Sequence, residues 1–258
     1  MEHLFQHFRE EERIFIEKAA GWKEQAENNY SPKLTDFLDP REQEIAEAVV
    51  GNTGEIKIAF YGGHPLTERK RALIYPEYFS PLPEDFSLSL FSLQYPEKFV
   101  TVEHRQVLGS LLSIGLARAK FGDILFLDQQ VQIVAAEEYE PFLTMNFHHV
   151  GKATVSLEKI SFSDIIEPRQ EISEASATVS SLRLDAVGAA IYNLSRQKMQ
   201  SLITGGAVKV NFRQVEQASF ECREGDMLSV RGHGRSKLLS VDGKTKKDKI
   251  KIRAGKQK

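Results

Sequence analysis

The stretch RLDAVGAAIYNLSRQKMQSLITGGAVKVN, residues 183–211, predicts two short helices followed by a strand. Apolar residues recur in its first part at the spacing of one helical face, at Leu184, Val187, Ile191 and Leu194. Ser195 is a typical N-cap for the second helix, which Gly205 and Gly206 would end in a left-handed C-cap. Three further elements complete a compact α+β unit: a strand over 207–210, a turn at Gly225 and Asp226, and a strand over 227–230.

Basic side chains lie at the ends of these predicted elements. Arg183, Arg196 and Lys198 fall near helix N-termini, where free backbone N–H groups also favour phosphate. Double-stranded RNA is recognised mainly through its backbone and shape, so a basic surface of this kind suits it. The basic residues expected to form it are Arg183, Arg196, Lys198, Lys209, Arg213, Arg231, Arg235 and Lys237. The alternative is that these are ordinary surface charges on short elements.

The formal charge divides along the chain. In a protein of 258 residues with a net charge of −2, residues 1–180 hold 17 Lys and Arg against 29 Asp and Glu, a net of −12. Residues 181–258 hold 17 against 7, a net of +10, and the two parts sum to −2. A basic final third beside an acidic remainder indicates a local polyanion site, although a solvated basic tail would produce the same count.

The composition disfavours several protein classes. The single cysteine, Cys222, cannot form an internal disulfide or a cysteine-based zinc site, which favours a reducing compartment. The N-terminus MEHLFQHFREEERIF is acidic where a signal peptide is basic, and no stretch approaches the roughly 18 apolar residues of a membrane span. The cytoplasm is the expected location, without membrane contact. No cofactor or metal is expected, because no G-x-G-x-x-G follows a strand and adjacent His148 and His149 would diverge on a helix.

The first segment, about 1–75, is predicted to be an α+β domain. In LDPREQEIAEAVV, Asp39 can cap a helix, Pro40 fits its first position and Glu42 completes a capping-box-like pair. EIKIAFYGG is typical of a strand that ends in a glycine turn, and HPLTERKRALIYP of a returning strand. A second RNA contact is one hypothesis for the basic start of that strand, with a solvated hairpin tip as the alternative. Its residues are His64, Arg69, Lys70 and Arg71.

The middle segment, about 76–160, predicts the order β-α-β-β-α-β, which is the split βαβ (ferredoxin-like) arrangement. Strands are expected in FSLSLFSLQY with KFVTV, GDILFL, QQVQIVAA and KATVSLEKI, and helices in HRQVLGSLLSIGLARAK and EEYEPFLTMNFHHV. Many RNA-recognition domains use this arrangement, so an RNA-binding sheet face is one hypothesis. The basic-Gly-aromatic-Gly-aromatic run of that class is absent, which leaves a purely structural role equally open.

Two polar segments flank the C-terminal unit, which is predicted to span 181–240. Residues 161–180 are acidic and serine-rich, and are predicted to form a linker or a connecting strand. Residues 241–258 are lysine-rich, and are predicted to form a basic, partly disordered tail. The expected architecture is therefore α+β with three small domains.

The C-terminal unit resembles the RNA-binding domain named after small-subunit ribosomal protein S-four. The matching residues are Arg183-Leu184-Asp185, Ser195-Arg196, Ile203, Gly206, Val208, Val210-Asn211, Gly225-Asp226 and Val230-Arg231-Gly232. The resemblance adds Ser195, Gly206 and Asn211 to the expected RNA-binding residues. Phe212 stands where the broad family usually has glycine, so a less tight turn is expected there.

Almost the whole chain is similar to the YlmH family of bacterial proteins, through TDFLDPREQEIAEAV, IAFYGGHPLTERKRALIYP, HRQVLGSLLSIGLARAKFGDIL and the terminal domain. The resemblance implies a non-catalytic, rRNA-binding protein of ribosome quality control. Relatives are similar to the small heat-shock S-four protein, which binds free large subunits that still hold peptidyl-tRNA. There they hold the tRNA and support the tailing of stalled nascent chains. The family also implies a link to cell division. The expected partners of a monomeric chain are rRNA, tRNA, the large ribosomal subunit and a protein at the acidic N-terminal surface.

An RNA-modifying enzyme is the main alternative. The resemblance extends to pseudouridine synthases with S-four domains, whose Arg-Leu-Asp motif supplies an aspartate nucleophile and continues with a Thr-Ser-Gly run that shapes the pocket. Here Asp185 is followed by AVGAA and lies inside a predicted helix. It is therefore expected to be a structural partner of Arg183 or of a nearby helix end. A cell-division adaptor that uses the acidic surface is a third hypothesis.

Overall fold

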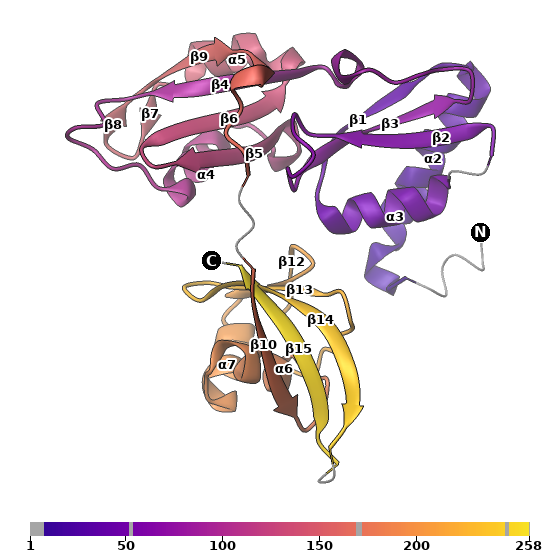
Figure 1. The fold of residues 1–258 in the computed structure, drawn as a ribbon, viewed down its shortest axis with the longest axis vertical. Coiled ribbons are helices and arrows are strands. Elements are labelled where there is room, and N and C mark those ends of the chain that lie inside the picture. The colour runs from indigo at the N-terminus through magenta and orange to yellow at the C-terminus, as the bar shows by residue number, and fades with distance from the viewer. Residues whose placement is uncertain (1–7, 52–53, 169–171, 246–247, 258) are drawn as a thin grey trace. The chain divides into compact units, whose positions relative to one another are not determined.

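A computed structural model of the chain describes residues 8–51, 54–168, 172–245 and 248–257. The chain divides into two units, 1–168 and 169–258, and each is considered by itself. Figure 1 shows the first unit as two main sheets with their helices, and the second as one larger sheet with two helices.

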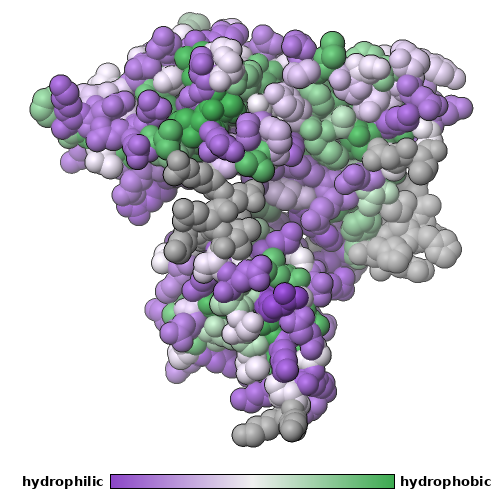
Figure 2. All heavy atoms as spheres, in the orientation of Figure 1, coloured by the Kyte–Doolittle hydropathy of each residue, from purple (hydrophilic) through white to green (hydrophobic). Residues whose placement is uncertain are grey.

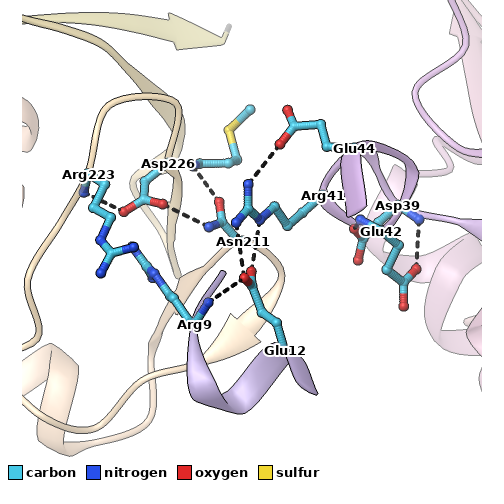
Figure 3. Close-up of polar contacts among 10 residues, drawn as sticks. Arg9, Glu12, Asp39, Arg41, Glu42, Glu44, Asn211, Arg223 and Asp226 are labelled. Atoms are coloured by element: carbon cyan, nitrogen blue, oxygen red, sulfur yellow. Dashed lines mark hydrogen bonds and ion pairs between the residues drawn. The ribbon is translucent and has the colours of Figure 1, made fainter. Parts of the chain in front are cut away.

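The N-terminal domain of the first unit is a three-stranded antiparallel sheet in the order β1-β3-β2. Its elements are η1 (Glu10–Glu12), α2 (Arg13–Asn29), β1 (Lys33–Leu38), α3 (Pro40–Val50), β2 (Ile56–Tyr61) and β3 (Lys70–Pro76). The predicted start of α3 is confirmed, because Asp39 and Glu42 each accept a hydrogen bond from the other's backbone N–H at 2.9 Å (Figure 3). Both helices bury apolar side chains against the sheet, with Ile16 of α2 and Ile45 of α3 in one cluster with Ile74 of β3.

The middle domain has the sheet order β5-β6-β4-β9, with every neighbouring pair antiparallel. Its elements are η2 (Pro83–Phe86), β4 (Leu88–Gln94), α4 (His104–Ser113), η3 (Arg118–Lys120), β5 (Phe121–Leu127), β6 (Gln130–Ala136), η4 (Glu137–Tyr139), α5 (Glu140–Asn146), β7 (His149–Val150), β8 (Ala153–Thr154), β9 (Ser156–Ile160) and η5 (Phe162–Asp164). This confirms the predicted split βαβ order. A buried core joins α4 and α5 to one face of the sheet, with Phe91 and Ile133 facing Val107 and Leu143.

The N-terminal and middle domains share a buried cluster. The ring of Phe37, from β1, packs with Leu90 and Val134 of the middle sheet. A Cβ atom added at Gly122 would lie 2.7 Å from that ring, so β5 approaches Phe37 more closely than a side chain would allow. This packing makes the two domains one compact unit.

Ion pairs reinforce the same boundary. Arg71 of β3 pairs with Glu138 at 3.0 Å, and Lys120 pairs with Asp36 of β1 at 2.7 Å. The Arg71 side chain is buried, so its guanidinium group is one of the interior polar contacts between the domains. Removing Glu138 would leave the buried guanidinium group of Arg71 without this carboxylate, which links the stability of the two domains.

The C-terminal unit is a six-stranded antiparallel sheet in the order β10-β15-β14-β13-β11-β12. Its elements are β10 (Ile172–Val179), α6 (Leu184–Tyr192), α7 (Arg196–Thr204), β11 (Val208–Val210), β12 (Arg213–Gln214), β13 (Met227–Val230), β14 (Gly234–Lys244) and β15 (Ile250–Gln257). The two helices cover one face, through a cluster that contains Leu184, Val187, Met199, Leu228 and Leu238. The predicted N-cap is confirmed, since the Ser195 hydroxyl accepts a hydrogen bond from the Lys198 backbone N–H at 3.1 Å.

For the segment 161–180, predicted as a linker or a connecting strand, the structure shows a strand, whereas for 241–258 it differs from the predicted tail. The segment 161–180 supplies β10, an edge strand of the C-terminal sheet. The segment 241–258 supplies β15, which lies between β10 and β14, so the prediction of a partly disordered tail is wrong for this strand. In β15 exposed Lys251 is flanked by half-buried Ile250 and buried Ile252. This period of two is that of a strand with one buried face, and the high lysine content concealed it.

Candidate nucleic-acid interface

The carboxylate of Asp185, in the first turn of α6, is the centre of a polar cluster. Its side chain is 0% exposed. Arg183 donates from Nε to Oδ1 at 3.2 Å, and Arg196 donates from Nε to Oδ2 at 2.9 Å. Gln200 donates from its amide to Oδ2 at 2.7 Å. One carboxylate therefore ties the N-cap residue of α6 to α7, while the two arginine side chains stay 42% and 49% exposed.

These donors hold the pKa of Asp185 well below its usual range. Burial raises the pKa, but the hydrogen bonds from Arg196, Arg183 and Gln200 outweigh that effect. The predicted pairing of Asp185 with Arg183 is confirmed. A nucleophile must reach its substrate, and this carboxylate is both buried and held by three side chains, so its geometry suits a structural role rather than attack on a base.

Two basic side chains lie in the first turn of α7, where no side chain is acidic. Arg196 and Lys198 are both exposed there. The helix dipole places partial positive charge at this end, so cations do not stabilise the helix in these positions. Together with the backbone N–H groups they instead create a local field that favours an anion such as phosphate. The Ser195 hydroxyl contributes by capping the helix.

Asn211 fastens the turn after β11 to the start of β13 (Figure 3). Its side-chain amide donates to Asp226 Oδ1 at 2.8 Å, and its side-chain oxygen accepts from the Met227 backbone N–H at 2.9 Å. Asp226 is 5% exposed and also accepts from the Arg223 backbone N–H at 2.7 Å. Both polar atoms of the Asn211 side chain are thus engaged within the unit, which gives this predicted RNA-binding residue a structural task.

The turn at Asn211 and Phe212 is tight, which corrects the looser turn that the sequence predicted. Val210 pairs with Arg213, so only two residues join β11 to β12. Their φ angles are 48° and 66°, as a two-residue type I′ hairpin requires. Phe212 therefore adopts the left-handed conformation that a glycine would adopt more easily, at the cost of backbone strain.

Three of the predicted cations lie on the sheet face that points away from the helices. Lys209, Arg235 and Lys237 each alternate with buried neighbours along their strands. Lys209 and Arg235 are both paired with Ser229, from opposite sides of β13. Arg235 and Lys237 belong to β14, whereas the sequence placed them after the last strand.

The predicted site residues consequently divide into two groups. The helix-edge group is Arg183, Ser195, Arg196 and Lys198, and the outer-face group is Lys209, Arg235 and Lys237. Among the others, Gly206 follows α7 with a φ of 66°, which confirms the predicted left-handed end. Arg213 begins β12 and Arg231 follows β13, and both are exposed. Sequence reasoning missed Gln200, which lies four residues after Arg196 on the same side of α7.

The second RNA contact was predicted at His64, Arg69, Lys70 and Arg71, and the structure excludes both arginines from it. Arg69 is 8% exposed and donates to the Phe37 carbonyl at 3.1 Å. Arg71 is 4% exposed and donates to the Thr35 carbonyl at 2.7 Å. These guanidinium groups serve the packing of the first unit and leave little surface for RNA. His64 and Lys70 are half-buried, and Lys70 donates to a backbone carbonyl nearby.

The free face of the middle sheet is largely covered by the chain itself. In RNA-recognition domains this face carries the aromatic side chains on which bases stack. Here Leu90 and Val134 point to it and are 0% exposed, packed against Phe37, Phe162 and Ile165. Figure 1 shows the chain crossing this sheet after β9.

A buried glutamine of β6 holds the segment after β9 against this face by hydrogen bonds. Gln132 is 6% exposed, donates to the Asp164 carbonyl at 2.9 Å and accepts from the Ile166 backbone N–H at 2.7 Å. In addition, residues 81–164 hold 6 Lys and Arg against 11 Asp and Glu, a net charge of −5. The covered part of this face cannot stack bases, and the net negative charge of the domain weakens its attraction for phosphate. RNA binding by this domain therefore stays a hypothesis that would have to use its uncovered surface.

Within the described part of the chain, no helix has the length and apolarity needed to span a membrane. The same residues contain no group of three or more His, Cys, Asp or Glu side chains that could hold a metal ion. His148 follows α5 and His149 begins β7, so the predicted helix ends before both.

Three family models match successive parts of the chain. They are "YlmH, N-terminal" over residues 11–79, "Putative RNA-binding domain in YlmH" over residues 81–164, and "S4 domain" over residues 182–228. The last of these contains α6, α7 and both groups' residues up to Lys209.

Relatives cover the chain more broadly. It is 48% identical to "Ribosome-associated protein quality control protein P2" of Bacillus subtilis (strain 168), over 100% of both chains. Among solved structures it is similar to "Cell division protein ylmH from Streptococcus pneumoniae", with 31% identity and a TM-score of 0.55. That match covers 62% of this chain and 98% of the other.

Proposed function

The chain belongs to the YlmH family, and we propose that it acts on ribosomes as a non-catalytic RNA-binding factor through its C-terminal unit. The observation that carries the proposal is the Asp185 cluster, which holds Arg183 and Arg196 in place while their side chains stay exposed. Guanidinium groups fixed in this way beside a helix N-terminus can contact successive phosphates of a structured RNA. Such contacts need positioning and charge, and no reactive group.

The finer proposal concerns which RNA is bound. A relative is named as a ribosome-associated quality control protein, which supports a ribosomal RNA. We propose that this is rRNA of the large subunit, close to peptidyl-tRNA, during the tailing of stalled nascent chains. A cytoplasmic, monomeric chain suits this task. The S4-type surface would then contact rRNA, tRNA or both, and its outer-face group would add phosphate contacts.

A second candidate function rests on the first unit. Residues 1–168 hold 16 Lys and Arg against 27 Asp and Glu, a net charge of −11. All nine large hydrophobic side chains that are exposed among the described residues also lie there, including Phe99 at 87% and Met145 at 74%. Figure 2 shows hydrophobic patches among hydrophilic residues on this unit. An acidic surface with exposed apolar side chains suits a protein partner. The first unit could therefore act as an adaptor that binds another protein. The name of one relative, a cell division protein, is consistent with an adaptor role.

The test is co-sedimentation of the full chain with purified large ribosomal subunits. We compare wild type with the helix-edge variant Arg196→Ala/Lys198→Ala and with the control Lys98→Ala/Lys152→Ala, which removes two exposed lysines from the first unit. We expect the helix-edge variant to lose most of its association at physiological salt, while the control keeps it. Equal association of all three proteins would contradict the proposal. A protein partner that stays bound after nuclease treatment would support the adaptor.

Crosslinking with RNA sequencing in cells then identifies the bound RNA. Sharp crosslinks to large-subunit rRNA and tRNA that disappear in an Arg196→Ala/Lys209→Ala variant support the finer proposal. Diffuse crosslinks that do not change in the variant would mean that the charge gives only non-specific affinity.

A further inference from the structure

Strands β14 and β15 form a long hairpin that continues past the end of β13 (Figure 1). β13 pairs only with residues 234–237 of β14, whereas β14 continues to Lys244. The residues matched by the S4 model end at 228. Residues 234–258, here named the arm, therefore lie outside the part of the unit that the S4 resemblance explains.

The arm holds most of the positive charge of the unit. Residues 234–258 contain 10 Lys and Arg against 2 Asp and Glu, a net of +8, out of the +10 carried by residues 181–258. Both acidic side chains of the arm are already paired with cations of the arm itself. Asp242 lies 3.0 Å from Arg253, and Asp248 lies 2.8 Å from Lys244. Exposed pairs of this kind are weak, and they neutralise only a small part of the charge.

The register of β15 places two of these cations on the outer face of the sheet. Lys251 and Arg253 are exposed and alternate with buried Ile252 and its neighbour Ala254, which face the helices. Their partners on β10 are short hydroxyl residues, Thr178 beside Lys251 and Ser176 beside Arg253. The long basic side chains thus project above small neighbours, from the same face of the sheet that carries the outer-face group.

The chemistry of this face favours a polyanion over a protein. Protein interfaces usually need an apolar core. Every exposed large hydrophobic side chain among the described residues belongs to the first unit, so the described C-terminal residues provide no such core. Phosphates spaced along a nucleic-acid backbone need only projecting cations and hydroxyl groups.

We propose that the arm is a second RNA-contacting surface, which holds the phosphate backbone of structured RNA through Lys249, Lys251 and Arg253. It acts separately from the helix-edge group and extends the outer-face group, whose Arg235 and Lys237 belong to the arm. It rests on the proposed function only in that the chain binds RNA. Lysines beside an exposed sheet edge can also serve to prevent strand pairing between molecules, and that role would leave RNA affinity unchanged.

The test measures how RNA affinity of the full chain depends on salt. The probe is a labelled RNA hairpin of about 16 base pairs, a length that small double-stranded RNA-binding domains span. The arm variant is Lys249→Gln/Lys251→Gln, and its matched control is Lys98→Gln/Lys152→Gln in the first unit. All four lysines are exposed, so we expect both variants to fold, and their melting curves are to be compared with that of wild type first. The slope is taken here as the size of the fall in log affinity per unit of log salt. Each lost phosphate contact lowers it by about 0.7 to 0.9, so the arm variant should lower it by about 1.4 to 1.8.

The outcomes separate the arm from the proposed function. A lower slope in the arm variant but not in the control supports the proposal. An unchanged slope in the arm variant, with a reduced slope in Arg196→Ala/Lys198→Ala, overturns the arm and leaves the proposed function standing. If the arm variant loses affinity for polyglutamate but keeps its slope on RNA, the arm serves an acidic protein and the proposal is wrong. Absence of RNA binding by wild type would contradict both.

Discussion

Arg196 and Asp185 lie eleven residues apart in sequence, and the arginine Nε is 2.9 Å from the buried carboxylate. The contact joins the start of α7 to the first turn of α6. Because the guanidinium group is held from one side only, its side chain remains 49% exposed. A residue of this kind is fixed by the fold and still available to a ligand, which is the arrangement that a preorganised phosphate contact needs.

Substitution of Asp185 by asparagine tests this relationship. The side chain keeps its size but loses the charge that attracts Arg183 and Arg196, so we expect a loss of about 2 kcal/mol in the free energy of unfolding. RNA affinity should fall as well, because both guanidinium groups lose their fixed position. Urea unfolding and RNA titration measure the two effects. Retained stability with an isolated loss of uridine isomerisation would instead identify Asp185 as a catalytic group.

The stability difference between wild type and Asp185→Asn should be independent of pH between about 5 and 8. The pKa of Asp185 is lowered in the folded state, so its stabilisation is complete above the unfolded pKa of about 3.9 and is lost only as pH falls through the folded value. A difference that changes steadily across the neutral range would show that another group titrates in the cluster.

Asp39 should show the opposite dependence. Burial, with a contribution from the charge of Glu42, raises its pKa to about 6. The folded state therefore binds this proton more tightly than the unfolded state, and stability falls as pH rises from about 4 to above 6, by about 3 kcal/mol. Asp39→Asn keeps the helix cap and removes the titration, so it should gain stability relative to wild type over this range. The fluorescence of Trp22, the single tryptophan, follows the unfolding of this domain, and parallel pH profiles of the two proteins would contradict the assignment.

Phe212→Gly should stabilise the C-terminal unit by about 1 kcal/mol. The φ of 66° at Phe212 is strained for a side chain and ordinary for glycine. Asn211→Ala is the matched variant in the same turn, and it should destabilise the unit because it removes the hydrogen bonds to Asp226 and Met227. Thermal unfolding compares them, and a loss of stability in Phe212→Gly would mean that the phenyl ring packs more favourably than the strain costs.

Phe37→Ala should destabilise the first unit by about 3 to 5 kcal/mol, the usual cost of removing a buried phenylalanine. The ring is 1% exposed and packs against the middle sheet from the N-terminal domain. Phe99→Ala is the control, since that side chain is 87% exposed and its removal should change stability by less than about 0.5 kcal/mol. Similar unfolding midpoints for both variants would show that the two domains do not depend on this contact.

The sequence was sufficient to predict the features that depend on residues close together in the chain. The Asp39 cap, the Ser195 cap and the split βαβ order all follow from residue types and spacing, and all are present. The partner of Asp185 was also predicted in part, since Arg183 is two residues away. Arg196 and Gln200 join the same carboxylate only because α6 and α7 pack together, which spacing along one chain does not reveal.

Long-range packing accounts for the predictions that were wrong. The basic start of β3 suggested a solvent-facing contact, but Arg69 and Arg71 are buried and donate to the carbonyl groups of Phe37 and Thr35 in β1. The lysine-rich end suggested a tail, but β15 pairs with β14 on one side and on the other with β10, which lies about 70 residues earlier in the sequence. In both cases the charged residues suggested exposure to solvent. The arginines are buried because they donate to distant carbonyl groups, and β15 is ordered because it pairs with two strands.

The segments that cover the outer face of the middle sheet restrict which substitutions its strands can tolerate. Leu90 and Phe91 are consecutive residues that point to opposite faces, and they are 0% and 1% exposed. A sheet with one wet face tolerates polar substitution at every second position, whereas a sheet enclosed on both sides tolerates it at neither. In a saturation mutagenesis of this chain, both sets of β4 positions should therefore be equally intolerant where the cover lies. A variant designed to carry a base-stacking surface here would first have to remove the contacts of Phe37 and of the segment after β9.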